Sequence, residues 1–142
     1  KRAYEILAIF NKNSGMLGIS GVSSDAREVE DAIAEGNERA ILTRQIYAER
    51  VRQVVGGFAM QLGHVDALVF TAGLGENDTS IREAILDGLK DGLSLNYDEV
   101  LNSKTRGKEQ LISTEDSKVD VWIVPTDEEL VLSRDAFELH NE

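Results

Sequence analysis

The stretch that decides the fold is Asp66-Ala67-Leu68-Val69-Phe70-Thr71-Ala72-Gly73-Leu74-Gly75-Glu76-Asn77. Its apolar residues Leu68, Val69 and Phe70 run without polar alternation, which is typical of a strand buried on both faces of a sheet. Two glycines follow directly, at positions 73 and 75. We therefore expect the strand to enter a glycine turn and then a helix.

The glycine turn is a candidate phosphate site. Because glycine lacks a Cβ atom, Gly73 and Gly75 can take positive φ and let a phosphate or ribose lie against main-chain N–H groups. A helix beginning near residues 78–80 would direct the positive end of its dipole to the same place, and Ser80 and Glu83 have capping-box spacing there. The segment alone is equally compatible with a tight strand-to-helix connection that binds nothing.

The chain is acidic. Its 142 residues include 26 Asp and Glu against 15 Lys and Arg, which gives a formal net charge of −11. Nucleic acids and anionic membranes favour a basic protein surface, so neither is expected as a partner. A hydrophobic share of 42% is typical of a globular chain, and the length suits one domain.

Cysteine is absent from the sequence. Disulfides, Cys-ligated zinc and thiol catalysis are therefore excluded for these residues, which suits a reducing compartment. No apolar run approaches the ~20 residues that span a bilayer, and the first residues lack a signal-peptide pattern. We expect a cytoplasmic protein.

Helical periodicity dominates the first half of the chain. It predicts a short helix around residues 4–10, an irregular Gly- and Ser-rich stretch over 15–24, and a helix over 26–35. The longest helix is expected over 38–62, between an N-cap at Asn37 and a glycine stop. Its apolar residues, spaced three and four apart, predict a stripe that faces the core: Tyr47, Val51, Val54, Val55, Phe58 and Leu62.

The second half predicts helix, strand and helix. Apolar spacing indicates a helix over 81–89, a second strand over 119–124, and a final helix over 127–139 with Thr126 in a capping box. Residues 96–109 are polar and charged and are interpreted as a surface excursion. Strands that alternate with helices pair in parallel, so the fold class should be α/β.

Four segments together resemble the C-terminal half of proteins of the acetate kinase family, in both order and spacing. The resemblance extends over about residues 14–137, and the segments are Gly18–Asp25, Glu35–Ala40, Phe70–Asn77 and Val124–Leu130. It implies the acetate and sugar kinase, Hsp70 and actin superfamily, with a C-terminal ribonuclease H-like domain that is incomplete at its N-terminal edge. Residues 1–142 would then form one nucleotide-binding domain, as a fragment of a longer two-domain kinase.

The function that the resemblance implies is transfer of the γ-phosphoryl group of ATP to acetate, with Mg²⁺, giving acetyl phosphate and ADP. Relatives that act on propionate look similar, so a propionate kinase fragment is an alternative. Catalytic residues are expected in the other half of the enzyme, so no catalytic residue is assigned here and the chain alone should be inactive. The family forms homodimers through this half, which makes an interaction module without nucleotide binding a further alternative.

The resemblance also assigns binding residues around the glycine turn. Ile81 matches a position that contacts the base, although its place on an apolar helix face fits a core role equally well. The adenine- and ribose-binding motif matches residue by residue at Gly73, Leu74, Gly75, Glu76 and Asn77.

Two further assignments lie far from the turn in sequence. Asp25, Ala26 and Arg27 match a second nucleotide segment, although the family usually has a large apolar residue at the middle position and Asp25 could simply cap a helix. Glu128 matches a magnesium-site residue and would act through water, since Mg²⁺ keeps much of its hydration shell. A carboxylate in the first turn of a helix is favoured by the dipole in any case.

Overall fold

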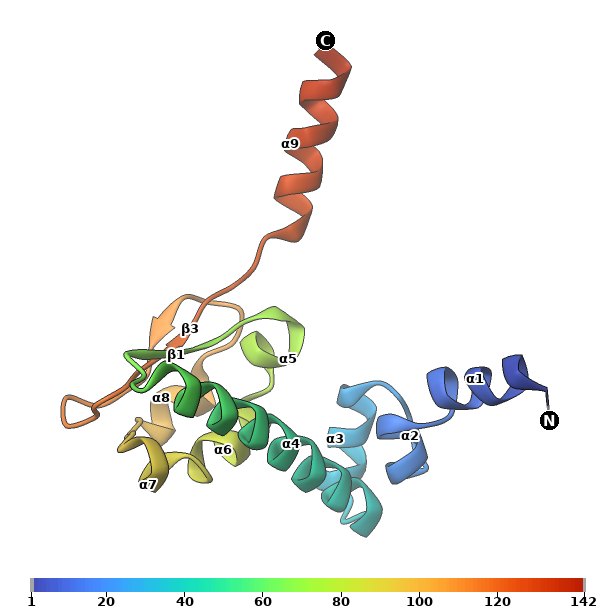
Figure 1. The fold of residues 1–142 in the computed structure, drawn as a ribbon, viewed down its shortest axis with the longest axis horizontal. Coiled ribbons are helices and arrows are strands. Elements are labelled where there is room, and N and C mark those ends of the chain that lie inside the picture. Colours follow the sequence, from blue (N-terminus) through green and yellow to red (C-terminus); the bar gives the residue numbers. More distant parts are fainter. Residues whose placement is uncertain (1, 142) are drawn as a thin grey trace. The chain divides into compact units, whose positions relative to one another are not determined.

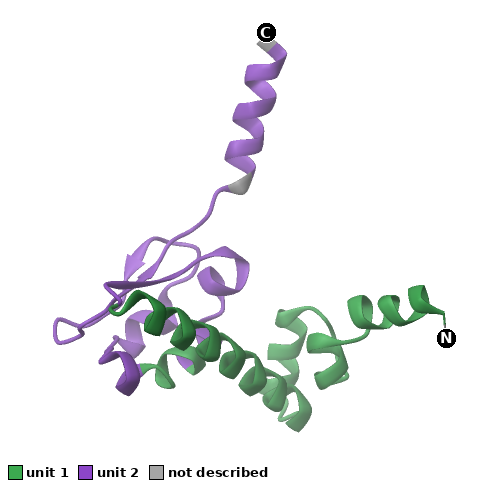
Figure 2. Cartoon of the chain, in the orientation of Figure 1, with its two compact units in different colours: residues 1–64, 84–89 green, residues 65–83, 90–142 purple. Residues whose placement is uncertain are grey.

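The structure is a computed structural model that describes residues 2–141, except for the side chains at positions 128 and 141. It divides into two compact units, coloured separately in Figure 2. Unit 1 comprises Lys1–His64 and Ala84–Leu89, and unit 2 comprises Val65–Glu83 and Lys90–Glu142. One domain over residues 1–142 stays a prediction.

Unit 1 is helical. Its elements are α1 (Ala3–Lys12), α2 (Gly15–Ser20), α3 (Ala26–Ala34) and α4 (Glu38–Leu62), and they follow one another in Figure 1. The predicted helices are confirmed, but α2 occupies part of the stretch that was predicted to be irregular. The predicted boundaries of α4 are also confirmed, because Asn37 Oδ1 accepts from two N–H groups of the first turn and Gly63 ends the helix at φ 80°.

The stripe predicted for α4 faces inward only in part, because Tyr47, Val51 and Val55 are half-buried. Val54, Phe58 and Leu62 are exposed, at 56%, 60% and 67% of their surface. Helix α4 instead packs against α2 and α3, and its buried residues are small: Ala40, Thr43 and Ala48. Small side chains let neighbouring helices approach closely, and a periodicity count that weights large apolar residues overlooks them.

Unit 2 is built on a three-stranded sheet in the order β1-β3-β2. Strand β1 (Ala67–Phe70) pairs in parallel with β3 (Asp120–Ile123), which confirms the predicted pairing and the α/β class, and β2 (Gln110–Leu111) adds an unpredicted antiparallel edge. The prediction that β1 is buried on both faces was wrong, because Phe70 is 8% exposed but Val69 is 50% exposed. Strand β1 lies at the edge of the sheet.

The remaining helices follow the strands along the chain (Figure 1). They are α5 (Ala72–Asn77), α6 (Thr79–Asp87), α7 (Lys90–Leu93), α8 (Glu99–Lys104) and α9 (Glu128–Asn141). Helix α6 confirms the predicted helix, and its apolar residues Ile81, Ile85 and Leu86 are buried. Residues 96–109 are not only a surface excursion, because they include α8 and the buried residues Asn102 and Thr105.

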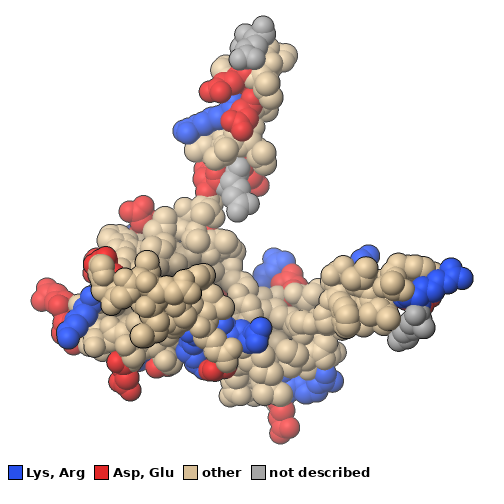
Figure 3. Space-filling model, in the orientation of Figure 1, with Lys and Arg blue, Asp and Glu red and all other residues tan. Residues whose placement is uncertain are grey.

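Surface charge is mixed. Figure 3 shows Lys and Arg side chains in separate small groups among acidic and uncharged ones on the visible face. Over the part of the chain that the structure describes, no helix combines the length and apolarity needed to cross a bilayer.

Candidate functional site

The glycine segment of residues 73–77 is a short helix and not a turn. Thr71 has extended backbone, and α5 begins at the next residue. The residue with positive φ is Ala72, at 58°, whereas Gly73 and Gly75 do not take positive φ. The sharp change of direction after β1 therefore occurs one residue earlier than predicted, and both glycines serve another purpose.

The two glycines differ in their surroundings. A Cβ atom on Gly75 would lie 3.2 Å from the carbonyl carbon of Phe70, so glycine is needed for close packing of α5 against the end of β1. A Cβ atom on Gly73 would meet nothing within 4 Å. The backbone at Gly73 is consequently open to approach from solvent.

Asn77 lies on the same exposed part of α5. Its Nδ2 donates to the Gly73 carbonyl at 3.1 Å, one helical turn earlier, and its side chain is exposed. Leu74, which lies between Gly73 and Asn77 in the sequence, is half-buried. The segment therefore presents a glycine backbone and a carboxamide together to solvent.

The last three carbonyl groups of α5 each accept a hydrogen bond from outside the helix. Gly75 O accepts from Arg82 Nη1 at 2.9 Å, and Glu76 O accepts from the Gly107 N–H at 3.1 Å. Asn77 O accepts from Arg106 Nη1. Carbonyls at the C-terminal end of a helix have no intrahelical partner, so these contacts satisfy them and fix the end of α5.

Arg82 is the central residue of this arrangement, and its side chain is fully buried at 0% exposure. Its Nε donates to Asn102 Oδ1 at 2.8 Å, and its Nη2 donates to the carbonyls of Asn102 at 3.0 Å and Thr105 at 2.7 Å. Burial, and secondarily the nearby charge of Arg106, lowers the pKa of Arg82.

The sequence interpretation missed Arg82, although a signal was present. Arg82 shares the helical spacing of the buried residues Ile85, Leu86 and Leu89, at three, four and seven positions further on. A charged residue on an apolar stripe must find hydrogen-bond partners if the helix is buried. The stretch from Asn102 to Thr105 supplies them.

Glu76 directs its carboxylate to the residue that follows Pro125. Its Oε1 accepts from the Thr126 N–H at 2.8 Å and from the Thr126 hydroxyl at 2.9 Å. The N–H of Thr126, the largest cause, lowers the pKa of Glu76. The contact joins the glycine segment to the approach to α9, and a nucleotide contact through Glu76 stays a prediction.

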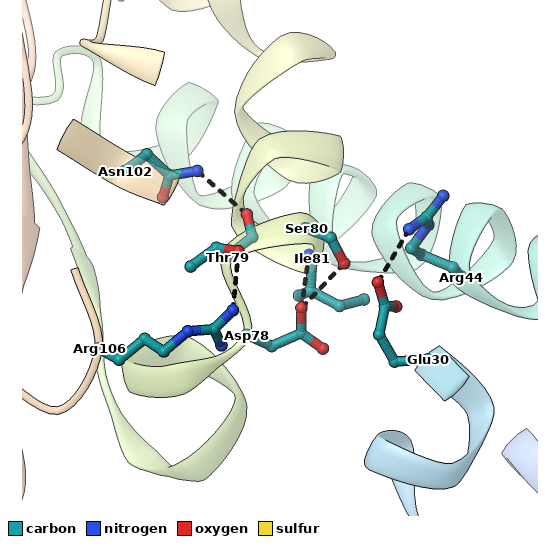
Figure 4. Close-up of polar contacts among 8 residues, drawn as sticks. All are labelled: Glu30, Arg44, Asp78, Thr79, Ser80, Ile81, Asn102 and Arg106. Carbon is teal, nitrogen blue, oxygen red and sulfur yellow. Dashed lines mark hydrogen bonds and ion pairs between the residues drawn. The ribbon is translucent and has the colours of Figure 1, made fainter. Parts of the chain in front are cut away.

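Helix α6 is capped by Asp78 and not by Ser80 as the capping-box spacing predicted. Asp78 Oδ1 accepts from the Ile81 N–H at 2.9 Å and from the Ser80 hydroxyl at 3.0 Å (Figure 4). Asp78 precedes the helix directly, so its short side chain reaches the third helical N–H. Ile81 is 5% exposed, and its contact with a base stays a prediction.

The segment Asp25-Ala26-Arg27 lies in unit 1, at the start of α3. Asp25 Oδ1 caps the helix by accepting from the Arg27 N–H at 2.9 Å, and its Oδ2 accepts from Arg27 Nη2 at 2.6 Å. These contacts with Arg27, the side-chain hydrogen bond first, lower the pKa of Asp25 to about 2. The Arg27 side chain is 88% exposed and pairs with Asp25.

The predicted metal residue Glu128 begins α9, but its side chain lies outside the described residues. The cap of α9 is Asp127, whose Oδ1 accepts from the Leu130 N–H at 2.9 Å. The predicted capping box at Thr126 is therefore wrong, because that hydroxyl donates to Glu76. Among the side chains that are described, no group of three or more His, Cys, Asp or Glu is placed to hold a metal ion.

The predicted site residues thus fall into two sets. Unit 2 contains the five residues of the glycine motif, Ile81 and the start of α9, and within it Glu76 contacts Thr126. Unit 1 contains residues 25–27, which contact one another. Arg82, Asn102, Thr105 and Arg106 support the first set and were not predicted.

Comparison with known proteins gives consistent results. The Acetokinase family profile matches residues 2–134. The acetate kinase of Clostridium botulinum (strain Loch Maree / Type A3) is 54% identical over 135 residues, which cover 95% of this chain and 34% of that protein. The chain therefore spans about a third of the length of this curated relative.

Solved structures agree with the sequence comparison. The crystal structure of Porphyromonas gingivalis acetate kinase matches with a TM-score of 0.87 and 46% identity, over 97% of this chain and 34% of that one. A propionate kinase from Francisella tularensis subsp. tularensis matches with a TM-score of 0.81 and 36% identity, over 92% of this chain and 32% of that one. Since the family profile covers nearly the whole chain, the chain belongs to the Acetokinase family.

Proposed function

We propose that this chain is the C-terminal, nucleotide-binding part of an acetate kinase. The whole enzyme would transfer the γ-phosphoryl group of ATP to acetate, with Mg²⁺, and release acetyl phosphate and ADP. The proposal includes the ribonuclease H-like class of domain, a homodimeric enzyme and a cytoplasmic location. It rests on family membership and on similarity to acetate kinases over nearly the whole chain, in both sequence and structure.

The observation that carries the proposal is the exposed face of α5. Gly73 leaves open space where a Cβ atom would stand, and the Asn77 carboxamide lies one turn further along. Such a face can take the ribose or base of a nucleoside, because main-chain atoms can be approached closely and a carboxamide can both donate and accept hydrogen bonds. The residues present are therefore compatible with a bound nucleoside.

A bound ATP would supply the phosphoryl group, and the residues of this chain would hold and orient its nucleoside. Phosphoryl transfer depends mainly on positioning and on neutralisation of charge. We assign no residue of the chain to the second task, and we expect nucleotide binding without turnover from the 142-residue chain. Glu128 as a magnesium residue stays part of the proposal.

The test is a calorimetric titration of the chain with ADP and with ATP, in the presence of Mg²⁺. Asn77→Ala should weaken binding by about tenfold, the effect of losing one or two hydrogen bonds. Gly73→Val should also weaken it, because the new side chain fits the free protein but occupies the space of the ligand. Gly92→Val is the matched control, since Gly92 is equally unobstructed and lies in α7. Binding that neither variant changes would contradict the proposal.

Propionate is the alternative substrate. The propionate kinase from Francisella tularensis resembles this chain nearly as well in structure as the acetate kinases do. We assign nucleotide-binding residues to this chain but no acyl pocket. Activity with acetate and with propionate must therefore be compared in the whole enzyme.

An interaction role is a second candidate function, favoured by exposed apolar side chains. Val69 on the edge strand is 50% exposed, and Phe58 and Met60 near the end of α4 are 60% and 83% exposed. Large exposed apolar groups are common at protein interfaces. Sedimentation of the chain with and without ADP tests this role: a dimer in both conditions supports it, and a monomer in both contradicts it.

A further inference from the structure

We infer that Arg82 is a positioning residue for the nucleotide face, acting through the backbone of α5. This inference rests on the proposed function. The Arg82 side chain is fully buried, and its described side-chain hydrogen bonds end on Gly75, Asn102 and Thr105. It therefore links the glycine segment to the C-terminal end of α8, a region that carries no assigned binding residue.

The shape of the Arg82 guanidinium group fixes the glycine segment. A guanidinium group is a rigid planar fork with five N–H donors, so several acceptors bound to it are fixed relative to one another. Nη1 of Arg82 donates to the Gly75 carbonyl at 2.9 Å, while Nη2 donates to the carbonyls of Asn102 and Thr105. The peptide at Gly75 lies between Gly73 and Asn77, so fixing it orients both.

Asn102 supports the Arg82 side chain. Its Oδ1 accepts from Arg82 Nε at 2.8 Å, and its Nδ2 donates to the Thr79 carbonyl at 3.0 Å. Figure 4 shows this second contact, which reaches from α8 to the first residue of α6. Asn102 is thereby held from both ends of its carboxamide, which gives Arg82 a rigid support.

The region around the end of α8 also holds the two carbonyls after Gly75. Gly107 N–H donates to Glu76 O at 3.1 Å, and Arg106 donates to Asn77 O and, at 3.5 Å, to Thr79 Oγ1. Residues 102–107 and Arg82 together account for three successive carbonyls of the binding segment. Arg82 differs from the others because it is completely buried and water cannot replace it.

The test compares Arg82→Lys and Arg82→Met with Ile112→Ala. Ile112 is a fully buried core residue of unit 2 that makes none of the described hydrogen bonds to α5, so its truncation destabilises the unit without touching the segment. Affinity for ADP is measured at a temperature at which circular dichroism shows each variant to be folded. Amide hydrogen exchange of residues 73–78 is measured on the same samples.

Arg82→Met should raise the Kd for ADP about 10- to 100-fold, the range seen when outer-shell support is removed from metal sites. Arg82→Lys keeps the charge but only one donor position, so it should restore part of the affinity. Ile112→Ala should leave the Kd within about twofold, because core truncation changes global stability only. An unchanged Kd in Arg82→Met, or an equal loss in Ile112→Ala, would overturn the inference.

Two further outcomes are separable. If Arg82→Met does not fold, Asn102→Ala takes its place, since it removes one acceptor and leaves Arg82 itself; an unchanged Kd there would overturn the inference. If the unmodified chain binds no ADP, the proposed function fails. Amide exchange then tests separately whether Arg82 positions α5. Faster exchange over residues 73–78 in Arg82→Lys than in Ile112→Ala supports that role, and equal exchange contradicts it.

Discussion

The two segments predicted to contact a nucleotide are held in place in different ways. Residues 73–77 are held by the buried Arg82 and by contacts from Arg106, Gly107 and Thr126, which are distant in sequence. Residues 25–27 are held by near neighbours in sequence: Asp25 pairs with Arg27, and the Asp25 N–H donates to the Ser23 hydroxyl, while Arg27 is almost fully exposed. Distant contacts make a segment rigid but sensitive to substitution elsewhere, whereas a local pair tolerates change around it.

The largest difference in stability is expected between two variants, each of which replaces the arginine that supports one of the two segments. Arg82→Leu leaves several buried carbonyls without a donor and should lower the free energy of unfolding of unit 2 by about 3 kcal/mol or more. Arg27→Leu should leave it unchanged within error. Trp122, the single tryptophan, lies in β3 of unit 2, so its fluorescence during guanidinium unfolding reports that unit. Equal midpoints for the two variants would remove the contrast.

The second contrast lies within α5. Gly75→Ala places a Cβ atom 3.2 Å from the Phe70 backbone and should cost about 1–3 kcal/mol through overpacking. Gly73→Ala meets nothing and should be neutral or stabilising by about 0.5 kcal/mol, because alanine restricts the unfolded chain. Thermal unfolding followed by Trp122 fluorescence measures both. A larger loss in Gly73→Ala than in Gly75→Ala would show that α5 packs differently.

Acid titration sharpens the comparison further. The pKa of Glu76 lies below its ordinary 4.5 in the folded chain, so its contact with Thr126 contributes fully above pH 4.5 and is lost as the pH falls through the lower folded pKa. Unfolding midpoints of the unmodified chain should therefore fall in that window. Glu76→Gln should show a shallower pH dependence there. Identical slopes would show that the carboxylate makes no such contact.

The smallest effect is expected at Asp25. Its pKa of about 2 comes from exposed contacts with Arg27, which water screens. Asp25→Asn keeps an oxygen that can cap α3 and should change stability very little, while Asp25→Ala should fray the first turn. Amide exchange of residues 26–29 distinguishes the two variants. Fraying in Asp25→Asn as strong as in Asp25→Ala would mean that the charge, and not the cap, holds the turn.

Local features were the ones that the sequence predicted well. Asn37 and Gly63 bound α4 as expected, and the two apolar runs form the strands β1 and β3. The residues concerned act through their own backbone neighbours or through a short apolar run, and both signals are visible within a few positions.

Features that depend on distant partners were missed. The cap of α9 is Asp127 and not Thr126, because Thr126 is engaged by Glu76, fifty positions away. Arg82 and α8 depend on each other in the same manner. A polar stretch such as residues 96–109 carries no periodic signal when its role is to supply carbonyl groups to a buried cation.

The most direct measurement is a titration of the ¹⁵N-labelled chain with ADP and Mg²⁺, followed by the amide resonances. We expect saturable shifts centred on Gly73 to Asn77 that disappear in Asn77→Ala while the rest of the spectrum is retained. Saturable shifts confined to other residues, or none at any concentration, would contradict the claim that the exposed face of α5 binds the nucleotide.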